Sequence, residues 1–172
     1  MKSMKKRVLV VDDDAAVRES VRKVLEAANY DVVLAADGNE VDESLPEGID
    51  LVLLDLNLPS LNGWDIFERL TTQHPFLPVI IITGMPNQYK TARIAGVGAL
   101  MEKPIEPPAL LKTMDDLLAE PHRTRLRRVC GYLNDTRYMR PSNAPAVGKL
   151  RERAITPQQR FRTSHSARKR EK

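Results

Sequence analysis

The chain has 172 residues, of which 42% are hydrophobic and 29% charged. This composition is typical of a globular protein in solution and excludes a largely disordered or membrane-embedded chain. No apolar run approaches the roughly 20 residues that a membrane-spanning helix needs. The basic N-terminus precedes an apolar run of only four residues, 8–11, which is too short for a signal peptide. Together with the single cysteine, Cys130, this predicts a cytoplasmic protein.

Charge divides the chain into two unlike parts. Residues 121–172 contain 15 Lys and Arg against 3 Asp and Glu, a net charge of +12. The preceding 120 residues contain 12 basic and 20 acidic side chains, a net charge of −8. We therefore predict a folded domain at 5–121 and a basic C-terminal extension at 122–172.

Short apolar runs alternate with helical patterns through the first part. Strands are expected at 7–11, 31–35, 51–54, 79–82 and 99–102. Between them, apolar residues recur with helical spacing, as in the stretch from Val17 to Leu25. Shorter helices are expected near 39–45 and 86–95, one opens near Gly63, and the last begins near Pro107. This alternation predicts an α/β fold, a doubly wound five-stranded parallel sheet flanked by helices.

Polar side chains follow four of the predicted strands. The first strand ends at Asp12 and Asp13, the third at Asp55, the fourth at Thr83, and the fifth is followed by Lys103. Each residue alone has an ordinary structural explanation, such as a helix cap or a surface charge. The carboxyl ends of parallel strands share one edge, however, so these side chains are expected to converge. Three close carboxylates repel unless a cation joins them, and Mg²⁺ with oxygen ligands fits best. A hydroxyl and an ammonium beside it favour a bound phosphoryl group, with an Asp as nucleophile.

Residues 5–120 resemble the receiver domain of bacterial two-component response regulators, the CheY-like family with a flavodoxin-like fold. The resemblance rests on four stretches in matching order and spacing: Val8-Leu9-Val10-Val11-Asp12-Asp13-Asp14, Leu53-Leu54-Asp55-Leu56-Asn57-Leu58-Pro59 with Gly63 following, Ile81-Ile82-Thr83-Gly84, and Lys103-Pro104.

This resemblance implies a role for each matching position. Asp55 would accept a phosphoryl group from a sensor histidine kinase or a phosphotransfer protein. Mg²⁺ would be held by Asp12, Asp13 and Asp55, with the backbone carbonyl of Asn57 as a further ligand. Thr83 and Lys103 would contact phosphoryl oxygens, and a cis peptide bond would precede Pro104. No independent turnover is expected, so the chain is not interpreted as an enzyme. Family members often pair through their last helices and strands, and a homodimer is among the expected assemblies.

One position departs from the family pattern. Three residues before the lysine, the family usually has an aromatic side chain that turns inward when the threonine moves, whereas this chain has Leu100. Leucine has less reach and no ring, so a weaker or differently transmitted switch is predicted.

An enzyme of another class is the main rival. Asp12-Asp13-Asp14 after an apolar strand resembles the haloacid dehalogenase-type phosphohydrolases, in which Asp12 would be the nucleophile and Asp14 the acid/base. Ala16 stands where that motif requires Thr or Val, and no acidic pair follows Lys103 at a strand end. Both features favour the receiver interpretation.

The extension at 122–172 is poor in large apolar residues and interrupted by prolines, so a mostly disordered basic C-terminal tail is expected. It lacks the apolar periodicity of a helix-turn-helix. Its charge suits contact with nucleic acid or an acidic partner, or binding back onto the acidic first domain.

Overall fold

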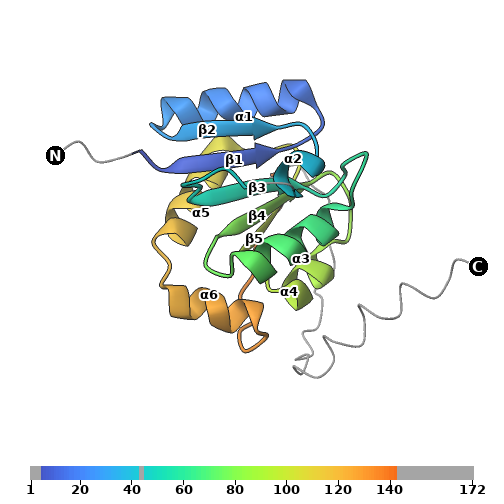
Figure 1. The fold of residues 1–172 in the computed structure, drawn as a ribbon, viewed down its shortest axis with the longest axis vertical. Coiled ribbons are helices and arrows are strands. Elements are labelled where there is room, and N and C mark those ends of the chain that lie inside the picture. Colours follow the sequence, from blue (N-terminus) through green and yellow to red (C-terminus); the bar gives the residue numbers. More distant parts are fainter. Residues whose placement is uncertain (1–4, 43–44, 143–172) are drawn as a thin grey trace, which may run out of the picture.

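The computed structural model describes residues 5–42 and 45–142. It contains one parallel sheet whose strands lie in the order β2-β1-β3-β4-β5-β6 (Figure 1). The strands are β1 (Arg7–Val11), β2 (Asp31–Ala35), β3 (Leu51–Asp55), β4 (Val79–Thr83), β5 (Ala99–Glu102) and β6 (Arg137–Met139). The predicted α/β fold is therefore confirmed, with the first five strands where the apolar runs indicated.

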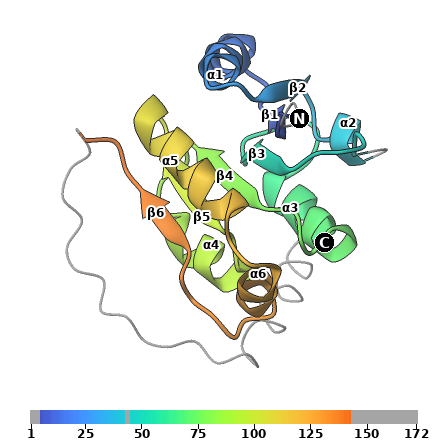
Figure 2. The same ribbon diagram turned by 90° about the vertical axis from the view of Figure 1, so that its left-hand side faces the viewer.

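Helices cover both faces of the sheet (Figures 1 and 2). They are α1 (Ala15–Ala27), α2 (Asn39–Asp42), α3 (Gly63–Gln73), α4 (Tyr89–Ala95), α5 (Pro107–Leu118) and α6 (His122–Val129). One core cluster joins the sheet to α1 and α5 through residues such as Leu25 and Leu110. The other joins it to α2, α3 and α4 through Val41, Phe67 and Ala92. Because both faces are covered, β3 and β4 are buried along their whole length.

Local sequence signals set the helix ends. The Asp14 carboxylate accepts hydrogen bonds from the first amides of α1, and the Asn62 side chain accepts one at the start of α3. Helix α4 begins at Tyr89 and not near Pro86 as predicted, because Asn87 has a φ of +62°, outside the helical region. Gly96, with a φ of +78°, ends α4 in the left-handed conformation.

The expectation of five strands was too low by one. Residues 122–142 are described, and they form α6 and β6, of which β6 pairs with β5. Arginines of this segment form ion pairs with the carboxylates Glu120 and Glu102 of the first domain, consistent with the segment binding back onto it. The predicted disorder and nucleic-acid contact of the remaining tail concern 143–172, which lie outside the described residues. Cys130 lies exposed at the end of α6.

Among the described residues, none of the helices has both the length and the apolar character needed to cross a bilayer.

Candidate functional site

Four of the predicted site residues lie at the same edge of the sheet. Asp12 directly follows β1, Asp55 ends β3, Thr83 ends β4 and Lys103 follows β5. The register brings these ends together, since Asp55 lies opposite Ile82 and the next residue, Thr83, opposite Glu102. The edge predicted from the strand ends is thus present in the fold.

Lys103 connects two of the carboxylates. Its Nζ donates hydrogen bonds to Asp12 Oδ2 at 2.7 Å and to Asp55 Oδ2 at 2.6 Å. Asp12 is 3% exposed and Asp55 4%, whereas the Lys103 side chain retains 24% exposure. Two nearly buried anions therefore share one cation, whose side chain still reaches the surface.

Burial and the ion pairs act in opposite directions on the ionisation of this group. Burial raises the pKa of the Asp12 carboxyl, and the hydrogen bonds from Lys103 and from the Asp14 amide offset only part of that rise. Burial alone would lower the pKa of Lys103, but the bonds to Asp12 and Asp55 outweigh it and raise the pKa. The lysine consequently stays charged and offsets part of the negative charge of the two carboxylates that it bonds.

A third carboxylate completes an oxygen-donor set. Asp12, Asp13 and Asp55 each offer an oxygen, and these oxygens lie within 4.8 Å of one another. Asp13 is exposed, so the group opens to solvent on its side. Hard carboxylate oxygens at this spacing fit Mg²⁺, which usually takes one or two carboxylates and keeps several waters. The donor set therefore fits the predicted magnesium ion.

The loop after β3 is shaped around Asp55. The Asn57 amide donates to Asp55 Oδ1 at 3.0 Å, which fixes the carboxylate and places Asn57 next to it. Gly63 packs directly on this loop, since a Cβ there would lie 2.6 Å from the Asp55 carbonyl oxygen and 2.5 Å from the Leu56 Cα. Any larger residue at 63 would push the loop away from the carboxylate group.

Thr83 and Asp14 have more local roles in this conformation. The Thr83 hydroxyl is fully buried and accepts a hydrogen bond from the Met85 amide at 3.0 Å. Asp14 Oδ1 caps α1 at the Ala16 amide, 2.8 Å away, and does not belong to the group of three carboxylates. The cis peptide bond expected before Pro104 is present.

Comparison with known proteins identifies the family. The family model described as the response regulator receiver domain matches residues 8–115, which include all of these strand ends. The chain belongs to the response regulator receiver family. Members of this family are in general not classical enzymes.

Individual relatives agree with this assignment. The response regulator MprA of Mycolicibacterium vanbaalenii is 38% identical over 117 residues, covering 65% of this chain and 50% of that protein. The chain thus spans about half the length of the curated relatives it matches. A CheY-like receiver domain protein from Methanospirillum hungatei JF-1 has a TM-score of 0.64 and 30% identity, covering 70% of this chain and 98% of that one. Chemotaxis response regulator CheY4 of Vibrio cholerae has a TM-score of 0.60 at 28% identity, covering 66% and 99%.

Sequence reasoning missed one set of residues around the receiver site. Glu102 and Glu106, on either side of Lys103, accept hydrogen bonds from Tyr138 and Ser142. Tyr138 lies opposite Leu100 in the register between β5 and β6. Leu100 is the residue that stands where the family usually has an aromatic side chain. An isolated aromatic in a basic, proline-interrupted stretch gave no periodic signal by which to find it.

Proposed function

We propose that Asp55 is the phosphoacceptor of this receiver domain, that Asp12, Asp13 and Asp55 hold Mg²⁺ with the Asn57 backbone carbonyl, and that Thr83 and Lys103 contact the phosphoryl oxygens. The observation that carries the proposal is the buried Asp55 carboxylate, bonded by Lys103 at 2.6 Å within a group of three carboxylates. Of these three carboxylates, Asp55 lies at the end of the central strand and is fixed by the loop that follows.

The reaction is transfer of a phosphoryl group from a phosphohistidine to a carboxylate oxygen of Asp55. The O–P bond to Asp55 forms as the N–P bond to the imidazole breaks, and the departing imidazole takes up a proton. Lys103 keeps its positive charge at the strand edge and moves from the carboxylate to a phosphoryl oxygen. The Thr83 hydroxyl turns from the Met85 amide to donate to another oxygen. The metal ion supplies positive charge that offsets the charge on the transferred group.

A groove next to the site suits the phosphoryl donor. It has a volume of about 650 Å³ between α1 and α5 and reaches Lys103. Apolar side chains line it, among them Val17, Val21, Ile105 and Leu110. The phosphohistidine must approach Asp55 from this edge, so we assign the groove to the histidine-bearing helices of the kinase or phosphotransfer protein.

Independent turnover is not part of this proposal, and the expected location is the cytoplasm, where response regulators meet the catalytic domains of their kinases. Pairing of two chains is retained as a hypothesis on the resemblance alone.

Phosphorylation with acetyl phosphate and Mg²⁺ tests the assignment of Asp55. Intact-mass analysis should show one added phosphoryl group, and peptide mapping after borohydride reduction should locate it at residue 55. Asp55→Asn should remain unlabelled. Asp14→Asn is the matched control, since Asn keeps the acceptor oxygen that caps α1 and should be labelled like the parent. Label on Asp12 instead would favour the phosphohydrolase rival and refute the proposal.

A further inference from the structure

Residues 122–142, called here the strap, run along the edge of the sheet beyond the receiver match. Helix α6 packs against Gly96, which precedes β5, and β6 then runs parallel to β5 (Figure 2). The strap therefore starts near the amino end of β5 and finishes at the carboxyl end, where the acceptor site lies. Its path connects the two ends of the domain along one strand.

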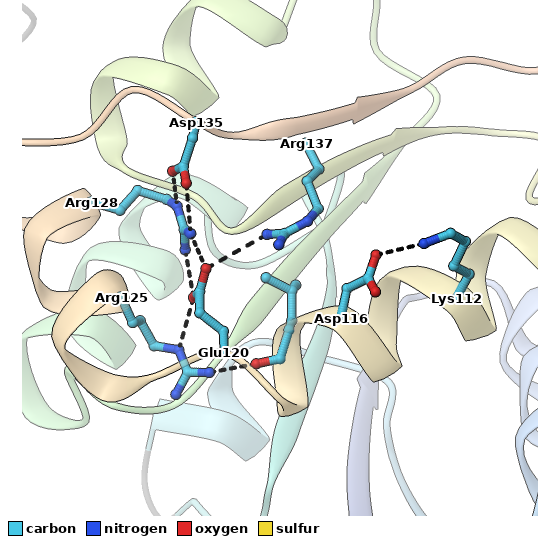
Figure 3. Close-up of polar contacts among 8 residues, drawn as sticks. Lys112, Asp116, Glu120, Arg125, Arg128, Asp135 and Arg137 are labelled. Carbon is cyan, nitrogen blue, oxygen red and sulfur yellow. Dashed lines mark hydrogen bonds and ion pairs between the residues drawn. The ribbon is translucent and has the colours of Figure 1, made fainter.

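The amino-terminal part of the strap, from α6 to the start of β6, is held by a buried ion-pair network (Figure 3). Arg128 is 1% exposed, and its Nη1 donates to Glu120 Oε2 at 3.0 Å while its Nε donates to Asp135 Oδ1 at 2.5 Å. Arg137, the first residue of β6, lies 3.7 Å from the Glu120 carboxylate, and its amide donates to the Gly98 carbonyl at 3.1 Å. The ion pairs of Arg128 thus fix α6, and the Arg137 amide forms the first backbone hydrogen bond of β6.

The carboxyl-terminal part of the strap, residues 138–142, is hydrogen-bonded to the loop that carries Lys103. The Tyr138 hydroxyl donates to Glu102, the residue before Lys103, and the Tyr138 ring stacks on Tyr89 of α4 at 4.6 Å between centroids. On the other side of Lys103, the amide of Ser142 donates to Glu106 Oε1 at 3.0 Å, and its hydroxyl donates to the same oxygen. Both carboxylates that flank the lysine therefore hold the strap.

From this geometry we infer that the strap is coupled to the acceptor site through Lys103, so that filling the site loosens β6 and loosening β6 favours filling the site. The inference rests on the proposed function of Asp55. It makes Tyr138 and Ser142 positioning residues, which act on the site only through the loop at 102–106.

The direction of the coupling follows from the contacts of Lys103. In this structure the lysine bonds to both Asp12 and Asp55, and its amide donates to the Thr83 carbonyl at 2.9 Å. A phosphoryl group on Asp55 takes the space of the direct lysine bond, so Lys103 must withdraw outward. We infer that Glu102 and Glu106 move with it, away from a strap whose helix α6 stays fixed by Arg128. Their bonds to the strap lengthen, and β6 loosens.

Amide exchange measured by NMR on the full chain tests the coupling, with beryllofluoride and Mg²⁺ as the activating probe. The amides of Arg137 and Lys103 report on the strap and on the site loop. The test variant combines Tyr138→Phe with Ser142→Ala, which removes both hydroxyl donors and keeps the ring stack. Tyr132→Phe is the control, because Tyr132 is 71% exposed and belongs to the same strap. Buried amides of α3 report any global change in stability.

Three results are expected. Beryllofluoride accelerates exchange at Arg137 in the parent chain but not in Asp55→Asn. Without any ligand, the double variant exchanges faster at both Arg137 and Lys103, by about fivefold for each hydrogen bond removed, while α3 is unchanged. Because coupling is reciprocal, the double variant also binds beryllofluoride more tightly than Tyr132→Phe does.

Other results separate the two proposals. If beryllofluoride binds but exchange at Arg137 stays constant or slows, the coupling is refuted and the acceptor role of Asp55 stands. If beryllofluoride does not bind the parent chain, the proposed function fails. The resting-state measurement then decides the coupling alone: acceleration confined to Arg137, without Lys103, overturns it.

Discussion

Replacing Arg128 with Met is the sharpest test of whether the strap belongs to the folded domain. The side chain is almost fully buried and forms ion pairs with Glu120 and Asp135. Removing one partner of a buried pair costs about 3–5 kcal/mol, mainly because the other charge stays buried without compensation. Glu120 keeps Arg125 and Arg137 at 3.7 Å, and the Asp135 side chain is 43% exposed. We therefore expect the lower limit, a loss of about 3 kcal/mol in the free energy of unfolding.

Urea unfolding followed by circular dichroism measures this loss. With a slope of about 2 kcal/mol per molar urea, the midpoint should fall by about 1.5 M. Arg127→Met is the matched control on the same helix, because Arg127 is exposed and its loss should cost no more than about 0.5 kcal/mol. Equal midpoints for the two variants would refute the buried network and with it the packing of α6 on the domain.

Three further predictions address other parts of the molecule. Gly96→Ala should lower the unfolding midpoint in urea by about 1 M, because the added Cβ would lie 2.5 Å from the Arg128 carbonyl at a residue whose φ is positive; an unchanged midpoint would contradict the close approach of α6. Burial opposes ionisation of Asp50, but hydrogen bonds from Lys6 and the Arg7 amide outweigh it and hold the pKa of Asp50 below its usual value. The ionised Asp50 carboxylate therefore stabilises the fold above about pH 4, and this stabilisation is lost as pH falls through the lowered pKa. Between pH 5 and pH 3, the parent should consequently lose more stability than Asp50→Asn does. Thermal melts at the two pH values measure this difference. Removing Mg²⁺ with EDTA should abolish labelling by acetyl phosphate and excess Mg²⁺ should restore it, whereas labelling that persists in EDTA would contradict the metal site.

The first five strands and their polar ends were predictable because each depends on short-range pattern. The run Leu51–Leu54 is apolar without alternation, a pattern that indicates a strand covered on both faces. Asp55 follows at the strand end, and the parallel topology that brings it to Lys103 follows from the alternation of strands with helices.

The strap could not be predicted in the same way. Arg125 and Arg128 have the composition of an exposed helix face, yet both are buried. Their burial depends on partners outside their own helix, namely the Glu120 carboxylate, the Leu117 carbonyl and, 49 residues away, the Phe76 carbonyl. Such partners satisfy a guanidinium only after the chain has folded, so the local pattern carries no sign of them. Strand β6 is three residues long, too short for alternation to register.

The single cysteine of the chain gives direct experimental access to this segment. Cys130 lies exposed where α6 ends, within the strap and away from the acceptor edge. A fluorophore or spin label would attach at this one site, and no other cysteine would have to be replaced first, because the chain has no other thiol. Paired with a second label introduced on the exposed face of α1, it would give a distance whose distribution records each state of the strap in single molecules.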